Sequence, residues 1–148
     1  MSLKIQVLGL NKAINNIENY IQRKHVGLLG AVASSSQSIT SEAKKNAPVD
    51  LGDLKNNINY TIVDRKNMIE GNILSSSGYS AFVEYGTRPH RPPAKALEGW
   101  AARHGVPVGA VLNKIAREGT PAQPFMNPAA QSEKPKFLRA VRRVMSSP

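Results

Sequence analysis

The sequence contains no cysteine and few aromatic residues. The absence of cysteine excludes disulfides, cysteine-ligated zinc, iron–sulfur clusters and thiol catalysis. Because aromatic residues make up only 5% of the chain, we expect a core of aliphatic side chains and alanine. Long hydrophobic runs are also missing: the longest, residues 26–33, contains two glycines and is far shorter than a membrane span. Residues 1–9 lack the apolar stretch of a secretion signal, so we expect a soluble protein with no membrane partner.

Acidic residues are scarce as well, with ten Asp and Glu against twenty Lys and Arg, a net charge of +10. Residues 1–75 hold nine basic and six acidic side chains (+3), whereas residues 76–148 hold eleven and four (+7). This excess predicts contact with nucleic acid, an anionic surface or an acidic partner. The length of 148 residues predicts a single domain, residues 1–148.

Apolar residues recur at helical spacing through the first third of the chain and predict one long helix. Asn11 is placed to cap its start, and Pro48 to end it. Gly27 and Gly30 weaken its middle and predict a bend. Alternation at residues 4–8 predicts a short strand ahead of the helix. The helical stripe consists of Ile14, Ile17, Ile21, Leu28, Val32, Ile39 and Ala43.

A turn-rich joint at residues 48–54 follows, in which Asp50 is placed to cap the next element and Gly52 permits an unusual backbone shape. Alternation at residues 58–62 and again at 69–73, on either side of a polar turn, predicts an antiparallel hairpin with one face in water.

The second half of the chain predicts short helices. Residues 79–86 form a helical turn, and the Pro-rich residues 88–93 are extended. Two helices then follow up to residue 119, and Asn127 and Pro128 open a last, basic helix as its cap and first residue. The predicted fold class is therefore α+β: a long N-terminal helix packed on a small antiparallel sheet, with additional short helices in the C-terminal half.

Catalytic and metal-binding patterns are missing. His25, His90 and His104 occur outside any zinc motif, so we interpret them as structural histidines. Asp50 and Asp53 resemble an acid–base pair only in their spacing. We expect one of them to cap a helix or turn and the other to be its exposed neighbour. No nucleotide-binding or nucleophile-elbow motif is present. The sequence therefore predicts a protein that is not an enzyme and holds no cofactor or metal.

Glu84 precedes residues 86–88 (GTR) and has two interpretations. Its carboxylate either pairs with Arg88 four residues on, or accepts backbone N–H bonds and fixes the loop. In both cases the role is structural.

Three segments in order resemble a bacteriophage family. Residues 47–55 (APVDLGDLK) resemble its "APVDTGxLR" joint, residues 79–87 (YSAFVEYGT) its "YAxxVEFGT" segment, and residues 121–129 (PAQPFMNPA) its "PFLxPA" segment. The family comprises the head–tail joining or tail-completion (neck) proteins of lambda-like long-tailed phages. The segment of residues 88–119 is longer than the family minimum, and we interpret it as a Pro-rich arm with a two-helix elaboration. The residues that carry the motifs are Pro48, Asp50, Gly52, Leu54, Glu84, Gly86, Pro124, Phe125 and Pro128.

The resemblance implies a structural protein of the virion neck, made in the host cytoplasm. It implies a ring that joins head to tail around the DNA channel. A hexamer is the preferred copy number, with a dodecamer as the alternative. Its partners would be the head connector or adaptor, the tail terminator or tail tube proteins, and packaged DNA. A ring requires head-to-tail interfaces, and a proline-rich arm loses little entropy on docking. We expect five residues in or near these contacts: Tyr85, Arg88, His90, Arg91 and Trp100; for Trp100, filling its own core is an equal alternative.

The second hypothesis is a basic nucleic-acid-binding module. The last helix carries five basic residues that would contact DNA or an acidic partner: Lys134, Lys136, Arg139, Arg142 and Arg143. Only two aromatic residues lie nearby, which argues against a platform for stacked single strands.

Overall fold

The computed structural model describes residues 8–65 and 67–147, and its longest element is helix α1, Leu10–Asn46. Its 37 residues span about 55 Å. The predicted cap at Asn11 is wrong, because Gly9, in the left-handed conformation (φ 84°), holds the cap position and Asn11 lies inside the first turn. The helix ends as predicted, with Ala47 extended ahead of Pro48. The strand predicted at residues 4–8 lies outside the described residues except for Leu8, which is not in a strand.

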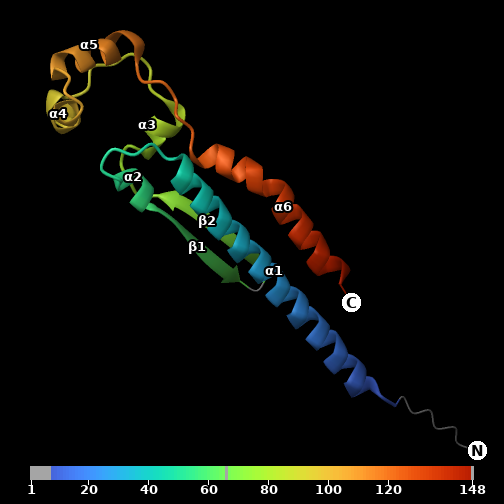
Figure 1. The fold of residues 1–148 in the computed structure, drawn as a ribbon. Helices are drawn as coiled ribbons and strands as arrows, with labels where there is room; N and C mark the ends of the chain where they lie inside the picture. Colours follow the sequence, from blue (N-terminus) through green and yellow to red (C-terminus); the bar gives the residue numbers. More distant parts are fainter. Residues whose placement is uncertain (1–7, 66, 148) are drawn as a thin grey trace, which may run out of the picture.

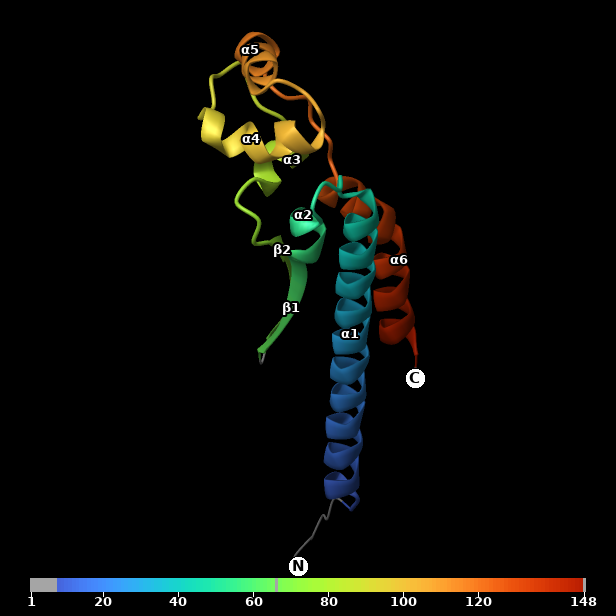
Figure 2. The same cartoon turned by 60° about the vertical axis from the view of Figure 1, so that its left-hand side comes forward.

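Helix α1 runs unbroken through Gly27 and Gly30, and Figures 1 and 2 show it straight, so the predicted bend is wrong. Gly27 allows a close approach to the last helix, α6 (Met126–Ser146). A Cβ added at Gly27 would lie 2.7 Å from Cγ1 of Val144, whereas the space around Gly30 is open. Helix packing therefore accounts for Gly27.

The predicted hairpin is confirmed. Strand β1 (Ile58–Arg65) pairs antiparallel with β2 (Met68–Ser75), and Ile58 lies opposite Ser75. One face packs on α1: Ile58 is fully buried, and a Cβ added at Gly71 would lie 2.1 Å from Oγ of Ser36. The other face, which carries Met68 and Leu74, is exposed, as the alternation predicted.

The remaining elements confirm an α+β fold with short helices in its second half. They are α2 (Asp53–Asn56), α3 (Ser80–Tyr85), α4 (Ala94–Arg103), α5 (Val108–Glu118) and α6. Helix α6 begins two residues earlier than expected, because Phe125 holds the cap position. Asn127 and Pro128 therefore lie in its first turn. Pro128 has no backbone N–H, but at this position that removes no hydrogen bond of the helix.

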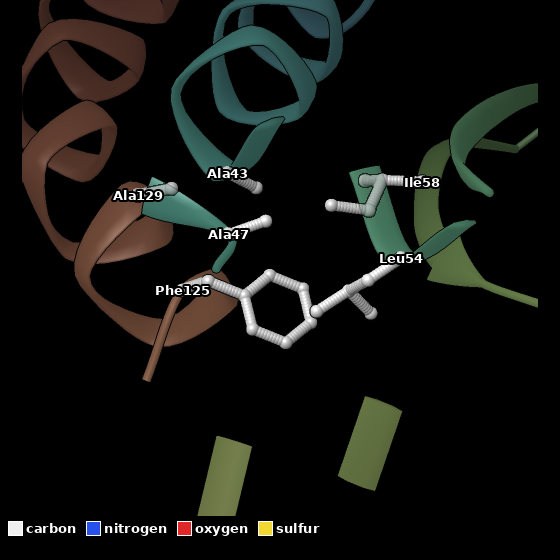
Figure 3. Packing of buried hydrophobic residues seen from close by; sticks show 6 residues of the cluster. All are labelled: Ala43, Ala47, Leu54, Ile58, Phe125 and Ala129. Atoms are coloured by element: carbon white, nitrogen blue, oxygen red, sulfur yellow. The ribbon is translucent and has the colours of Figure 1, made fainter. Parts of the chain in front are cut away.

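Helix α1 lies between the hairpin and α6 and packs against both (Figure 2). Helices α4 and α5 pack on each other away from this body (Figure 1). The main core is small and sits where the carboxyl end of α1, α2, β1 and the start of α6 meet (Figure 3). Its largest fully buried side chains are Phe125, Leu54 and Ile58. Alanines on α1 and α6 complete it, as the composition predicted, whereas the aromatic Phe125 at its centre departs from the expected aliphatic core.

The part of α1 ahead of Lys24 stands clear of the rest of the described chain. The carboxyl end of α6 reaches α1 at Lys24, and the hairpin tip reaches it at His25. Ahead of these contacts, Ile14, Ile17 and Ile21 are 44–60% exposed. The predicted apolar stripe is therefore covered only along its second half. No helix in the described part of the chain is long and apolar enough to cross a membrane.

The two helix glycines give a matched test. Gly30→Ala should raise the free energy of unfolding by about 0.5–1 kcal/mol, because alanine is the better helix former and the space is open. The free energy of unfolding of Gly27→Ala should be at least about 1 kcal/mol lower than that of Gly30→Ala, because the added methyl group overlaps Val144. Urea unfolding measures both. Adding Val144→Ala should remove most of the difference, and equal effects at the two glycines would contradict close packing.

Candidate functional site

Glu84, in α3, is a buried carboxylate that binds the start of α6. Its Oε2 accepts the backbone N–H groups of Phe125 (2.8 Å) and Met126 (2.9 Å), and its Oε1 accepts that of Asn127 (2.9 Å). The first N–H groups of a helix have no partner within the helix, and a negative charge there also favours the helix dipole. Of the two roles predicted for Glu84, the structure selects backbone binding. No ion pair joins it to Arg88 among the described residues.

The charge state of Glu84 follows from these contacts. Burial acts to raise the pKa of Glu84, but hydrogen bonds from the backbone of Met126, Phe125 and Asn127 outweigh it and hold the pKa below its ordinary value of 4.5. The carboxylate is therefore ionised at neutral pH. A second bond, from Gln123 N–H to the carbonyl oxygen of Val83 (2.8 Å), also joins α3 to the segment before α6.

The joint at residues 48–54 is tied to the chain ahead of α3. Oδ2 of Asp53 accepts the hydroxyl of Ser77 (2.7 Å), and its Oδ1 accepts Nδ2 of Asn57 (2.9 Å). The backbone N–H of Leu54 donates to the hydroxyl of Tyr79 (3.1 Å). With its side chain in the core, Leu54 fixes the joint against both α3 and the hairpin.

Asp50 does not cap a helix, contrary to expectation, because Gly52 (φ 83°) holds the cap position of α2. The carboxylate of Asp50 instead pairs with the guanidinium of Arg103 at the end of α4, with Nε 3.0 Å from Oδ1 and a second bond from Nη2 to Oδ2. The Arg103 guanidinium also holds the pKa of Asp50 below its usual range. This ion pair links the joint to α4.

Residues 88–119, the arm, enter and leave the body at one point. Thr87 N–H donates to the carbonyl oxygen of Thr120 (3.0 Å), Thr120 N–H donates to that of Thr87 (3.3 Å), and the two hydroxyls lie 3.0 Å apart. Gly86 (φ 70°) and Gly119 (φ 73°) flank this bridge. A Cβ at Gly119 would lie 2.0 Å from the carbonyl oxygen of Thr87, so no other residue fits there.

The five residues predicted at subunit or partner contacts are all exposed, near the base of the arm and on α4. Tyr85 is 79% exposed. Trp100 is 38% exposed and stacks on His104 with ring centroids 4.1 Å apart, so it does not fill a core. Among the five, Nδ1 of His90 lies 2.9 Å from the carbonyl oxygen of Arg88.

The basic residues of α6 are exposed along most of the helix. Lys136 pairs with the buried Glu133 (3.0 Å), while Arg139, Arg142 and Arg143 have no ion-pair partner in the described part of the chain. Lys136, Arg139 and Arg143 follow one another at helical spacings of three and four, which places them along one side. This side offers positive charge to a partner.

Lys24 holds the other end of α6 and was missed by the sequence analysis. Its Nζ donates to the carbonyl oxygens of Val144 (2.7 Å) and Ser147 and to Oγ of Ser147 (3.0 Å). A cation that binds free carbonyls at a helix C-terminus is stabilising. The apolar stripe gave no signal for Lys24, because the position at which it is interrupted is the neighbouring His25.

The three histidines lie apart. His25 Nε2 is 2.9 Å from Oδ2 of Asp64, and His104 Nδ1 is 2.9 Å from the carbonyl oxygen of Trp100. Over residues 8–65 and 67–147, no three His, Asp or Glu side chains come together in a group that could hold a metal ion.

The Glu84 contacts predict a loss of stability on substitution. In Glu84→Gln, one oxygen becomes an NH2 group that faces a backbone donor, so we expect the free energy of unfolding to fall by about 2 kcal/mol. Glu118→Gln, at an exposed glutamate, is the control and should be close to neutral. Urea unfolding at pH 7 measures both.

The same variant separates the charge from the packing. Because the native carboxyl binds its proton more weakly than the unfolded one, its contribution is complete above the ordinary pKa of 4.5 and is lost as the pH falls through the native value. The stability gap between wild type and Glu84→Gln should therefore shrink on acidification. A gap that stays constant to pH 2 would contradict an ionised cap.

Comparison with known proteins concerns α1 to α3. Residues 11–86, just over half of the chain, match the model of the HK97-gp10-like family, described as "Bacteriophage HK97-gp10, putative tail-component". The matched region ends at Gly86, directly before the arm. No curated protein and no solved structure matches the chain. A tail component is a structural part of the virion and contacts other virion proteins. The chain therefore belongs to the HK97-gp10-like family of bacteriophage tail components.

Proposed function

We propose that this tail component is a subunit of the virion neck, where copies form a ring that completes the tail top or connector and joins head to tail around the DNA channel. The ring is a hexamer, with a dodecamer as the alternative. Its neighbours are the head connector or adaptor on one side and the tail terminator or tail tube on the other.

One observation carries this proposal: the part of α1 ahead of Lys24 exposes an apolar stripe that no other element of the described chain covers. Leu10, Ile14, Ile17 and Ile21 follow one another at spacings of four, three and four and are 44–60% exposed. Exposed apolar rows on a helix are stabilised by burial against another subunit. Repeating one head-to-tail contact around an axis closes a ring.

The arm supplies a second surface. The family match ends where the arm begins, and Thr87 and Thr120 fasten it to the body. Tyr85, Arg88, His90, Arg91 and Trp100 are exposed around it. In the ring we assign these residues to contacts with a neighbouring subunit or a neck protein, and we assign the arm to an elaboration of the family fold.

A deletion phage tests the proposal. Without this protein, heads and tails should accumulate unjoined in negative-stain images, and wild-type protein supplied in trans should restore joined particles. A chain with Ile14, Ile17 and Ile21 changed to Asp should fail, because the charges leave the stripe unable to pack. The control changes the exposed polar residues Asn15, Asn16 and Asn19 to Asp and should complement. Normal virions without the protein would overturn the proposal.

Arginines of α6 without an ion-pair partner among the described residues favour a second candidate function, nucleic-acid binding. A variant in which Gln replaces Arg139, Arg142 and Arg143 separates a DNA contact from a protein contact. If these side chains face packaged DNA, joined particles should form but lose DNA more readily. If the protein is a nucleic-acid-binding module, the purified protein should bind duplex DNA, and its affinity should fall steeply as the salt concentration rises. No duplex binding at low salt would exclude that candidate, and loss of joining would assign the arginines to a protein contact.

A further inference from the structure

The hairpin leaves a sheet edge open. The described sheet has only two strands, and no backbone hydrogen bond joins the outer edge of β2 to another described residue. Such an edge presents a row of N–H and C=O groups that can pair with a further strand.

A groove runs beside this edge. It has a volume of about 440 Å³ and is lined by α1, α6 and β2 but not by β1, so it is the outer edge of β2 that borders it. Its apolar lining comes from Val32 and Ile39 of α1, Ile69 and Ile73 of β2, and Phe137 of α6. A strand added to β2 would cover these side chains with one face and leave its other face in water.

Residues 4–8 of this sequence have the matching pattern. Ile5 and Val7 alternate with Lys4 and Gln6, which fits a strand with one apolar and one polar face. On β2, Gly71 faces α1, so by alternation Glu70 lies on the outer face. With Ile5 and Val7 over the groove, Lys4 shares that outer face with Glu70, which has no ion-pair partner among the described residues. Opposite charges on adjacent strands are favourable.

The segment cannot reach the groove of its own chain. Along α1, Leu10 and Val32 are 22 residues apart, about 33 Å. The six residues from 4 to 10 span at most about 20 Å when extended. Figures 1 and 2 show the amino-terminal end of α1 beyond the hairpin tip. The occupant of this groove must come from another molecule.

We propose that residues 4–8 of one copy pair as a third strand with the free edge of β2 of a second copy and place Ile5 and Val7 over its groove. The donor's exposed α1 stripe follows directly after this strand and is carried to the same interface. The contact is head-to-tail, because donor and acceptor surfaces differ, so it can repeat around a ring. This inference rests on the proposed ring and names the contact that builds it.

The absence of cysteine makes a clean cross-linking test available. One full-length chain carries Gln6→Cys and a second, mass-tagged chain carries Glu70→Cys or Asn72→Cys, all on the outer face. Mixing under mild oxidation should give a disulfide between the two chains. The control acceptor, Thr61→Cys, lies on the same face but on β1, one strand further away, beyond the reach of a disulfide. Equal cross-linking to Thr61→Cys would overturn the pairing.

A chain with both Gln6→Cys and Glu70→Cys should link only between molecules, and a disulfide within a monomer would overturn the proposal. Ile5→Asn with Val7→Asn should weaken self-association at least about tenfold by sedimentation, whereas Lys4→Asn with Gln6→Asn should change it far less. Rings that form without the cross-link would overturn strand donation and leave the proposed function standing. Cross-linked open chains in place of rings would support strand donation and overturn the ring.

Discussion

Three backbone N–H groups at the start of α6 bind a single carboxylate, and the order of the rest of the fold follows from that contact. Because Glu84 is fixed by α3, it sets where α6 begins, and it places Phe125 in the core beside Leu54. From there α6 returns along α1 until Lys24 binds its last carbonyls. The helix is thus held at both ends by charged side chains, one of each sign, while Phe125 and Ala129 at its start belong to the main core.

The sequence predicted the elements well because their signals are local. The two strands, the end of α1 before Pro48 and the order of short helices all follow from periodicity and proline positions. Helix starts were less accurate: at Gly9 and Phe125 the cap position is held by residues without a capping side chain, so Asn11 and Asn127 were misleading. For Gly27, composition indicated weakness, whereas the cause lies in Val144, which is more than a hundred residues away.

The site illustrates the same limit. The motif around Glu84 indicated a structural carboxylate, but its partners lie 41 to 43 residues further along the chain, and no spacing rule links them. Asp50 and Arg103 are 53 residues apart and are joined only by the folded arm. The apolar stripe of α1 was predicted correctly as a pattern, yet half of it is exposed, since a sequence does not state which subunit covers a face. That exposed half is the basis of the proposed assembly.

The bridge between Thr87 and Thr120 has a consequence for how this chain tolerates change. Because the two ends of the arm meet there, the entropy of closing the loop between them grows only slowly with its length. Insertions or deletions between these threonines that keep the ion pair of Arg103 with Asp50 would leave α1, the hairpin and α6 unchanged. The arm is thus the part of this chain whose length can change most freely around a constant scaffold.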